Sequence, residues 1–291
     1  MLGNPNDNII IRKEENDSGI DSSAYVKGIL YGEYLDLRST DNPNRKYKRK
    51  PNCKKIAKGK YVNTETGELI EAQQHDSRGD NFKLLVKSAH RLFMFVHTNF
   101  PCNEGLHVTL TYAKYQGDDK QVYSDFKKFW QKVRYRYPNL GYIAVLEPQQ
   151  NGSWHLHVLM KDVVSHESLF ISYYKLREFW THGTCYVNPM HPDEDYGYYF
   201  CKKINKLNPL LELYKPGVRY FRYSRNMQKP LEFVALLDEV NQFIAENNYH
   251  VTNEYSISVS KLDEYGEEQL LKQYFYRNLR KDNGGIYNDE D

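Results

Sequence analysis

Two apolar stretches flank a polar turn, Gln149–Gly152, within residues 141–160. Short apolar runs on either side of a turn that contains Asn-Gly predict a β-hairpin. His155 and His157 lie two positions apart in the second strand, and side chains two apart in a strand project from the same face. The pattern therefore predicts a hairpin that presents two histidines on one face of a sheet.

The length of the turn decides where Glu147 lies. A three-residue loop over residues 150–152, with Gly152 in a left-handed conformation, sets Glu147 directly opposite His155, where paired residues share a face. A two-residue Asn-Gly turn shifts the register by one and moves Glu147 to the other face. The three-residue loop is the prediction.

Apolar spacing predicts further elements along the chain. Strands are expected at residues 106–112, 183–187, 218–223 and 255–260. Helices are expected at 82–98, at 124–137 with Ser124 as N-cap, at 165–180 as one helix or two, at 231–246 and at 267–279. We expect an α+β fold in which a central antiparallel β-sheet is covered by helices on at least one face.

A further helix is predicted to begin near Pro192 and to reach Lys206. Gly197, Phe200, Cys201 and Ile204 have the i, i+3, i+4, i+7 spacing of a buried stripe. A second stripe of the same spacing is polar and consists of Tyr199, Lys202, Lys203 and Lys206. One face of this helix therefore packs, while the other presents a tyrosine beside three cations.

The chain is expected to divide into four parts. These are an N-terminal extension at 1–40, a basic segment at 41–82, a main domain at 83–230 and a C-terminal helical region at 231–291. The basic segment has nine Lys or Arg among residues 45–60 and leads into a hairpin near residues 64–67. Such a run is a solvated linker or a phosphate-binding segment, and the sequence leaves both open.

Composition narrows the setting of the protein. The 291 residues carry a formal charge of only +2, so local basic segments matter more than the total. The four cysteines form no C-x-x-C pair, which argues against a zinc ribbon and a disulfide framework and fits a reducing cytoplasm. No apolar run approaches the roughly 20 residues that span a bilayer, and no signal-peptide pattern begins the chain. We expect a soluble, cytoplasmic protein without a membrane partner.

Two histidines and a carboxylate on one face suit a divalent metal ion with open coordination positions. Imidazole ligands favour Mn²⁺ over Mg²⁺, although Mg²⁺ is available to the same site. Taken alone, the His-x-His pair is also consistent with an incidental pair, or with a structural zinc site that uses a cysteine such as Cys185.

Tyr199 changes this balance. A tyrosine hydroxyl has an ordinary pKa of about 10 and is a poor nucleophile, but neighbouring lysines and a metal favour its ionised form. Attack on a phosphodiester then yields a tyrosyl–DNA ester and a free hydroxyl, and conservation of the ester bond makes the step reversible without ATP. The chain has 26 tyrosines, most of which must serve packing or surface roles.

The order LHVTLTY, GYIAVLEPQQNGSWHLHVLM and DYGYYFCKKINK resembles the three motifs of the HUH endonucleases, in particular the rolling-circle replication initiators of phages and plasmids. The resemblance covers residues 83–227. It implies that His155, His157 and Glu147 bind the metal ion and that Tyr199 is the nucleophile. Lys202 and Lys206 are implied to assist the developing charge.

One departure from the family pattern is Lys203, which stands where many phage-type relatives carry a second tyrosine. The chain therefore resembles a single-tyrosine form. Termination would then need another subunit, a water molecule, or a shift of the nucleophile to Tyr196 or Tyr198.

The function implied by the resemblance is site-specific nicking of single-stranded DNA at a replication origin, which leaves the 5′ phosphate on Tyr199 and frees a 3′ hydroxyl. Implied partners are the origin DNA and, in the host, a helicase and a polymerase; the oligomeric state is left open. A relaxase or transposase of the same superfamily, a non-catalytic nucleic-acid-binding protein and a metal-dependent phosphohydrolase remain alternatives.

Overall fold

The computed structural model describes residues 9–15, 24–39, 53–57, 60–64, 66–71, 82–101, 104–165, 169–215, 217–262 and 267–282. The chain forms two compact units, one from residues 49–229 and the other from residues 1–48 together with 230–291. Most of the predicted basic segment, residues 45–52, lies outside the described residues. Both units are built on antiparallel sheets, so the predicted α+β class is confirmed.

A five-stranded antiparallel sheet organises residues 104–223. Its strand order is β10-β7-β9-β8-β11. The strands are β7 (Leu106–Tyr112), β8 (Leu140–Pro148), β9 (Trp154–Asp162), β10 (Gly183–Pro189) and β11 (Phe221–Tyr223). The central three strands are rich in β-branched and aliphatic residues, which favour a sheet that is buried on both faces.

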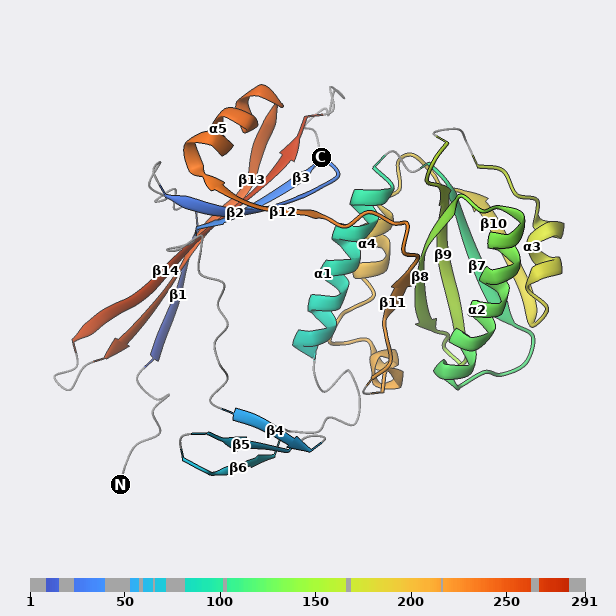
Figure 1. Ribbon diagram of the computed structural model, residues 1–291, viewed down its shortest axis with the longest axis horizontal. Helices are drawn as coiled ribbons and strands as arrows, with labels where there is room; N and C mark the ends of the chain where they lie inside the picture. Colours follow the sequence, from blue (N-terminus) through green and yellow to red (C-terminus); the bar gives the residue numbers. More distant parts are fainter. Residues whose placement is uncertain are drawn as a thin grey trace. The chain divides into compact units, whose positions relative to one another are not determined.

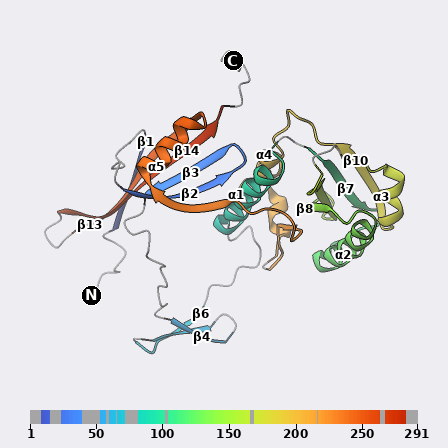
Figure 2. The same ribbon diagram turned by 45° about the horizontal axis from the view of Figure 1, so that its top comes forward.

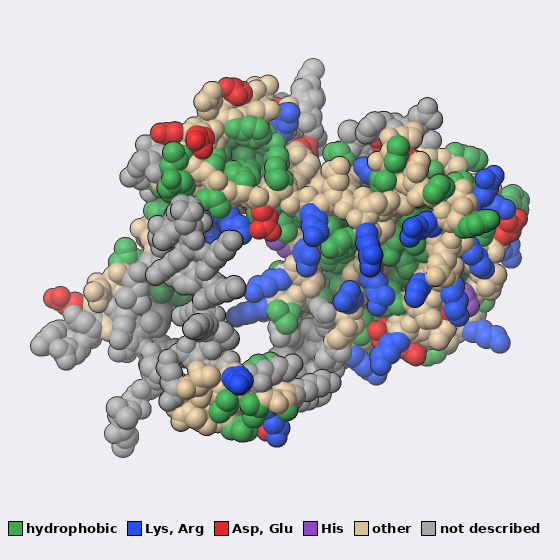
Figure 3. Space-filling view, viewed as in Figure 1, with side chains coloured by type: hydrophobic (Ala, Val, Ile, Leu, Met, Phe, Trp, Pro, Cys, Tyr) green, Lys and Arg blue, Asp and Glu red, His purple; other side chains and the backbone are tan. Residues whose placement is uncertain are grey.

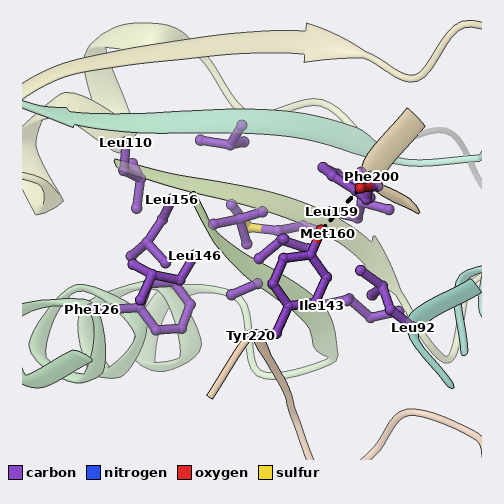
Figure 4. Packing of buried hydrophobic residues seen from close by; sticks show 14 of the residues in the cluster. Leu92, Leu110, Phe126, Ile143, Leu146, Leu156, Leu159, Met160, Phe200 and Tyr220 are labelled. Carbon is purple, nitrogen blue, oxygen red and sulfur yellow. Dashed lines mark hydrogen bonds between the residues drawn. The ribbon is translucent and has the colours of Figure 1, made fainter. Parts of the chain in front are cut away.

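Helices cover both faces of this sheet. Figure 1 shows α1 (Phe82–Asn99) and α4 (Tyr196–Cys201) on one side and α2 (Asp119–Arg136) and α3 (Tyr173–Phe179) on the other, and Figure 2 shows the same layers in a second view. Alternate residues of β9 serve the two layers. Leu156 packs with Leu146 and Phe126 on the α2 side, while Leu159 and Ile143 lie toward Leu92 of α1 (Figure 4).

The hairpin β8–β9 has the predicted register. Glu147 pairs with His155, and the backbone N–H of Gln149 donates to the carbonyl of Ser153 at 2.8 Å, which closes a loop of residues 150–152. Gly152 has φ of 80°, a conformation that costs other residues about 1–2 kcal/mol. The three-residue loop and the position of Glu147 are therefore confirmed.

Three helix predictions for this unit need correction at their ends. Helix α2 begins at Asp119 rather than after Ser124, because the Asp118 side chain accepts from the backbone N–H of Lys120 and caps the helix earlier. Helix α3 is short and is capped by Ser172. Helix α4 ends at Cys201 and does not extend to Lys206.

A three-stranded sheet lies earlier in the same unit. It consists of β4 (Cys53–Ala57), β5 (Lys60–Asn63) and β6 (Leu69–Glu71). Strands β5 and β6 pair antiparallel around the turn at residues 64–68, so the hairpin predicted there is confirmed.

The other unit is a six-stranded sheet of order β1-β13-β14-β3-β2-β12, packed against α5 (Leu237–Glu246). Its strands are β1 (Ile9–Glu15), β2 (Tyr25–Tyr31), β3 (Tyr34–Ser39), β12 (Leu231–Leu236), β13 (Tyr249–Leu262) and β14 (Glu268–Lys281). Two C-terminal helix predictions were wrong. The segment 267–279 is a strand, and the segment 231–246 is a strand followed by a shorter helix.

Candidate active site

The paired strands bring two histidines and a carboxylate to one point. The ligand atoms of Glu147, His155 and His157 all lie within 4.8 Å of one another. The Nε2 atoms of the two histidines are 2.9 Å apart, and the Nε2 of His157 is 3.1 Å from Oε2 of Glu147. All three side chains are at least four-fifths buried. The cluster is therefore preorganised by backbone pairing and shielded from solvent.

Two residues of β7 hold His157 from behind. The Nδ1 atom of His157 is 3.0 Å from Nε2 of His107 and 3.2 Å from the hydroxyl of Thr109, and His157 is only 7% exposed. Thr109 thus supports the histidine strand, which was one of the two roles open to it. His107 was not singled out from the sequence, although its alternation with Thr109 placed it on this face.

The charge states suit a metal ion. Burial, followed by the charges of His157 and Glu147, lowers the pKa of His155 to about 4. Burial also lowers the pKa of His107 to about 4. Burial alone would raise the pKa of Glu147, but hydrogen bonds from His157 and Lys203 outweigh it and hold the pKa at about 2. At neutral pH the site therefore offers neutral imidazole nitrogens beside an ionised carboxylate, the donor set of a divalent transition ion.

The zinc alternative with Cys185 does not fit the sheet. Cys185 pairs with Leu110, and paired residues share a face. Leu110 alternates with Thr109, so Cys185 lies on the α2 side of the sheet, away from the histidines. Its thiol is buried, and burial raises its pKa to about 12. Cys185 therefore takes no part in the cluster.

Helix α4 places Tyr199 over the same cluster. The Tyr199 ring centroid lies 6.0 Å from that of His157 and 6.0 Å from that of His107. Gly197 allows the close approach of α4 to α1, since a Cβ at this position would come within 2.7 Å of the His97 ring. The buried hydroxyl of Tyr220 donates to the carbonyl of Phe200 at 2.9 Å, a bond drawn in Figure 4. These contacts fix the helix that carries Tyr199.

Lys203 joins the tyrosine to the cluster. Its Nζ donates to both carboxylate oxygens of Glu147, at 2.6 and 2.7 Å, and lies 3.4 Å from the Tyr199 hydroxyl. Lys202 reaches the tyrosine from another side, with Nζ 5.4 Å from the ring centroid. The Nζ of Lys206 instead lies over the ring of Phe82 at 5.5 Å. Lys203 and Lys202 are thus brought to the site, whereas Lys206 is directed toward α1.

The other two tyrosines of α4 occupy different surroundings. The Tyr196 hydroxyl accepts a hydrogen bond from the backbone N–H of His191 at 3.0 Å, and its ring is buried. Tyr198 is 61% exposed. Tyr199 is therefore the tyrosine of this helix whose hydroxyl meets the lysine of the cluster.

Among the described residues, no helix is both long and apolar enough to cross a membrane.

Comparison with known proteins places the central region in a family. No curated protein matches the sequence. Among solved structures, the N-terminal nuclease domain of non-structural protein 1 of minute virus of mice is 9% identical, with 87% of this chain and 85% of that chain covered at a TM-score of 0.18. The family model for replication-associated protein ORF2 matches residues 105–208, which span β7, the hairpin and α4. This match confirms the relation to replication initiators. Residues 105–208 therefore belong to the replication-associated protein ORF2 family.

Proposed function

We propose that this protein initiates replication by nicking single-stranded DNA at an origin, with Tyr199 as the nucleophile. The observation that carries the proposal is the link from the Tyr199 hydroxyl through Lys203 to Glu147, at 3.4 Å and 2.6 Å, because it places a nucleophile and a three-ligand metal cluster in one site. A replication role is supported by the family match over residues 105–208.

In the proposed step, the Tyr199 oxygen attacks the scissile phosphorus while the phenol loses its proton. The bond from phosphorus to the 3′ oxygen breaks, and that oxygen takes up a proton to become a free 3′ hydroxyl. One phosphodiester is exchanged for another, so neither ATP nor water is consumed. The 3′ hydroxyl is the end that a polymerase extends, and the 5′ phosphate stays on the protein.

The metal ion would be held by His155, His157 and Glu147. Once bound, Mn²⁺ or Mg²⁺ supplies a Lewis acid that polarises a phosphate oxygen. The chain's own residues have separate roles. His107 and Thr109 orient His157, and Lys203 and Lys202 supply positive charge next to the phenol, where it favours the ionised nucleophile.

The proposal is tested with a pool of single-stranded oligonucleotides that have a randomised centre and a fluorophore at the 3′ end. After incubation with the protein and Mn²⁺, a denaturing gel should show fluorescence that migrates with the protein, because the 3′ fragment carries the attached 5′ phosphate. Sequencing of the attached fragments gives the preferred nick site. Cut fragments without an adduct would point to a phosphohydrolase that uses water. Binding with neither product would point to a non-catalytic DNA-binding protein.

The lysines give a second prediction. Lys203→Gln should slow adduct formation by about 10² to 10³, the range for loss of one preorganised charge at a reacting centre. Lys206→Gln is the matched control and should change the rate less than about threefold, because the Lys206 ammonium lies over Phe82. Single-turnover rates at saturating DNA separate these effects from binding. Equal losses in the two variants would contradict the assignment of Lys203.

A further inference from the structure

A basic groove lies on the α2 side of the sheet, at the turn end of the hairpin. Its volume is about 860 Å³, and it is bounded by the first turns of α2, by Trp154 and by the segment that leads from the 3₁₀ helix η1 (Pro209–Leu213) to β11. Figure 3 shows Lys and Arg side chains gathered over the part of the molecule where Figure 1 draws β11 and α2. The groove is separate from the cluster around Tyr199, which lies on the opposite face of the same strands.

The groove carries an excess of positive charge. Its cations outnumber its two acids, Asp118 and Asp119, and are Lys120, Lys127, Lys215, Arg219 and Arg222. Asp118 is already engaged as the N-cap of α2. Within the part of the chain that the structure describes, no ion pair joins any of the five cations to a carboxylate. The groove therefore presents a positive surface that its own residues do not neutralise.

Arg222 gives a second, independent indication of an anion. It enters from β11 and its guanidinium carbon lies 3.5 Å from the centroid of the Tyr123 ring. Its Nε is buried and has no hydrogen-bond partner. A buried donor without an acceptor costs about 1–3 kcal/mol, and such a donor commonly marks the place of an unseen partner. An anionic oxygen in the groove would supply the missing acceptor.

The form of the anion follows from the aromatic residues. Stacking of bases requires exposed ring faces, but Tyr123 is only 4% exposed and Trp154 only 3% exposed. The groove thus offers cations without a stacking surface, which suits phosphates and gives no means of reading bases.

The groove adjoins the candidate active site through the hairpin itself. Trp154 lines the groove, and the next residue in β9, His155, belongs to the metal cluster. Consecutive Cα atoms are about 3.8 Å apart, and consecutive side chains of a strand project to opposite faces. A polymer that passes over the turn at residues 150–152 therefore reaches both.

We propose that this groove binds the sugar-phosphate backbone of the DNA strand next to the nick site, without regard to sequence. The identity of the polymer as DNA rests on the proposed function. The groove increases the affinity for the strand and fixes its path, while recognition of the origin sequence is left to other surfaces.

The test compares two triple variants of the full chain that lose equal charge. The groove variant is Lys127→Gln, Lys215→Gln and Arg219→Gln. The control variant is Lys128→Gln, Lys132→Gln and Arg136→Gln, on the α2 surface that faces α3. In the control region Lys128 lies near Asp125, and Lys132 donates to the carbonyl of Phe179. Binding to a single-stranded oligonucleotide of random sequence is measured by fluorescence anisotropy in EDTA at several salt concentrations.

The groove variant should bind at least tenfold more weakly at low salt. Its slope of log affinity against log salt should fall by about 2, from about 0.7 per lost phosphate contact on a single strand. The control variant should change affinity less than threefold. Equal losses in both variants, which indicate only net charge, or no loss in the groove variant would overturn the proposal. Circular dichroism checks that both variants are folded.

The binding test does not depend on chemistry. If the unaltered protein formed no adduct, the proposed function would fail, while the comparison of the two variants would still decide the groove. If the adduct forms, the groove variant should reach the unaltered rate at saturating DNA, because its substituted residues lie on the other face of the sheet from Tyr199. A reduced rate at saturation would contradict a role confined to binding.

Discussion

Tyr199→Phe is expected to abolish the covalent adduct with single-stranded DNA and to lower strand cleavage by at least about 10³-fold, as loss of an essential nucleophile does in other covalent mechanisms. The substitution removes one oxygen and leaves the ring, which packs beside His157, Phe200 and Lys203. Affinity for DNA should therefore be unchanged. The measurement is adduct formation with the 3′-labelled pool and Mn²⁺, with binding followed separately by anisotropy.

Two tyrosines of the same helix serve as controls. Tyr198→Phe should leave the rate within about twofold, because the Tyr198 side chain is largely exposed and lies outside the cluster. Tyr196→Phe removes the acceptor for the His191 backbone N–H and should affect stability more than chemistry. Retention of the adduct in Tyr199→Phe, with its loss in either control, would move the nucleophile to that tyrosine.

His157→Ala is expected to weaken Mn²⁺ binding by about 100-fold or more and to remove metal-dependent cleavage with it. His157 is the central member of the cluster, since its two ring nitrogens contact His155, Glu147, His107 and Thr109. DNA binding should be largely retained, because phosphate contacts by Lys and Arg supply most non-specific affinity. Calorimetric titration with Mn²⁺ gives the metal affinity, and the adduct assay gives the activity.

His182→Ala is the matched control for this experiment. His182 is also a histidine near a carboxylate, with Nε2 3.6 Å from Oδ1 of Asp125, but it lies on the α2 side of the sheet. Its substitution should change neither metal affinity nor cleavage. Addition of EDTA should stop cleavage by the unaltered protein. Cleavage that survives both EDTA and His157→Ala would remove the metal from the proposed mechanism.

The hairpin could be predicted because everything that determines it is local. Gly152, a loop of three residues and strict alternation fix which residues oppose each other, so the position of Glu147 followed from counting. The sheet class followed from the same patterns. Partners on distant strands did not: His107 meets His157 only because β7 pairs with β9.

Lys203 shows the limit of helical spacing. The i+3 and i+7 rule favoured Lys202 and Lys206, and it holds only while the helix continues. Helix α4 ends at Cys201, and the chain then turns, with the backbone N–H of Ile204 bonded to the carbonyl of Cys201. This turn directs Lys203 to Glu147 and Lys206 to Phe82. The end of a helix depends on tertiary packing, which local sequence does not record.

The C-terminal error has a related cause. Residues 267–279 are rich in Glu, Gln, Leu and Lys, which favour helix in isolation. Their partners in the sheet are β13 and β3, and β3 lies more than 200 residues earlier in the chain. Pairing over that separation overrides the local preference and leaves no mark in a short window of sequence.

The sheet built from both ends of the chain also sets an order of events during synthesis. β14 lies between β13 and β3, so the six-stranded sheet cannot be continuous until β14 has left the ribosome. Residues 49–229 are complete before that, and domains generally fold as units during translation. The unit that holds Tyr199 and the metal cluster can therefore fold while β2 and β3 still await their partners. A nascent chain stalled before β14 should already contain a protease-resistant nuclease unit.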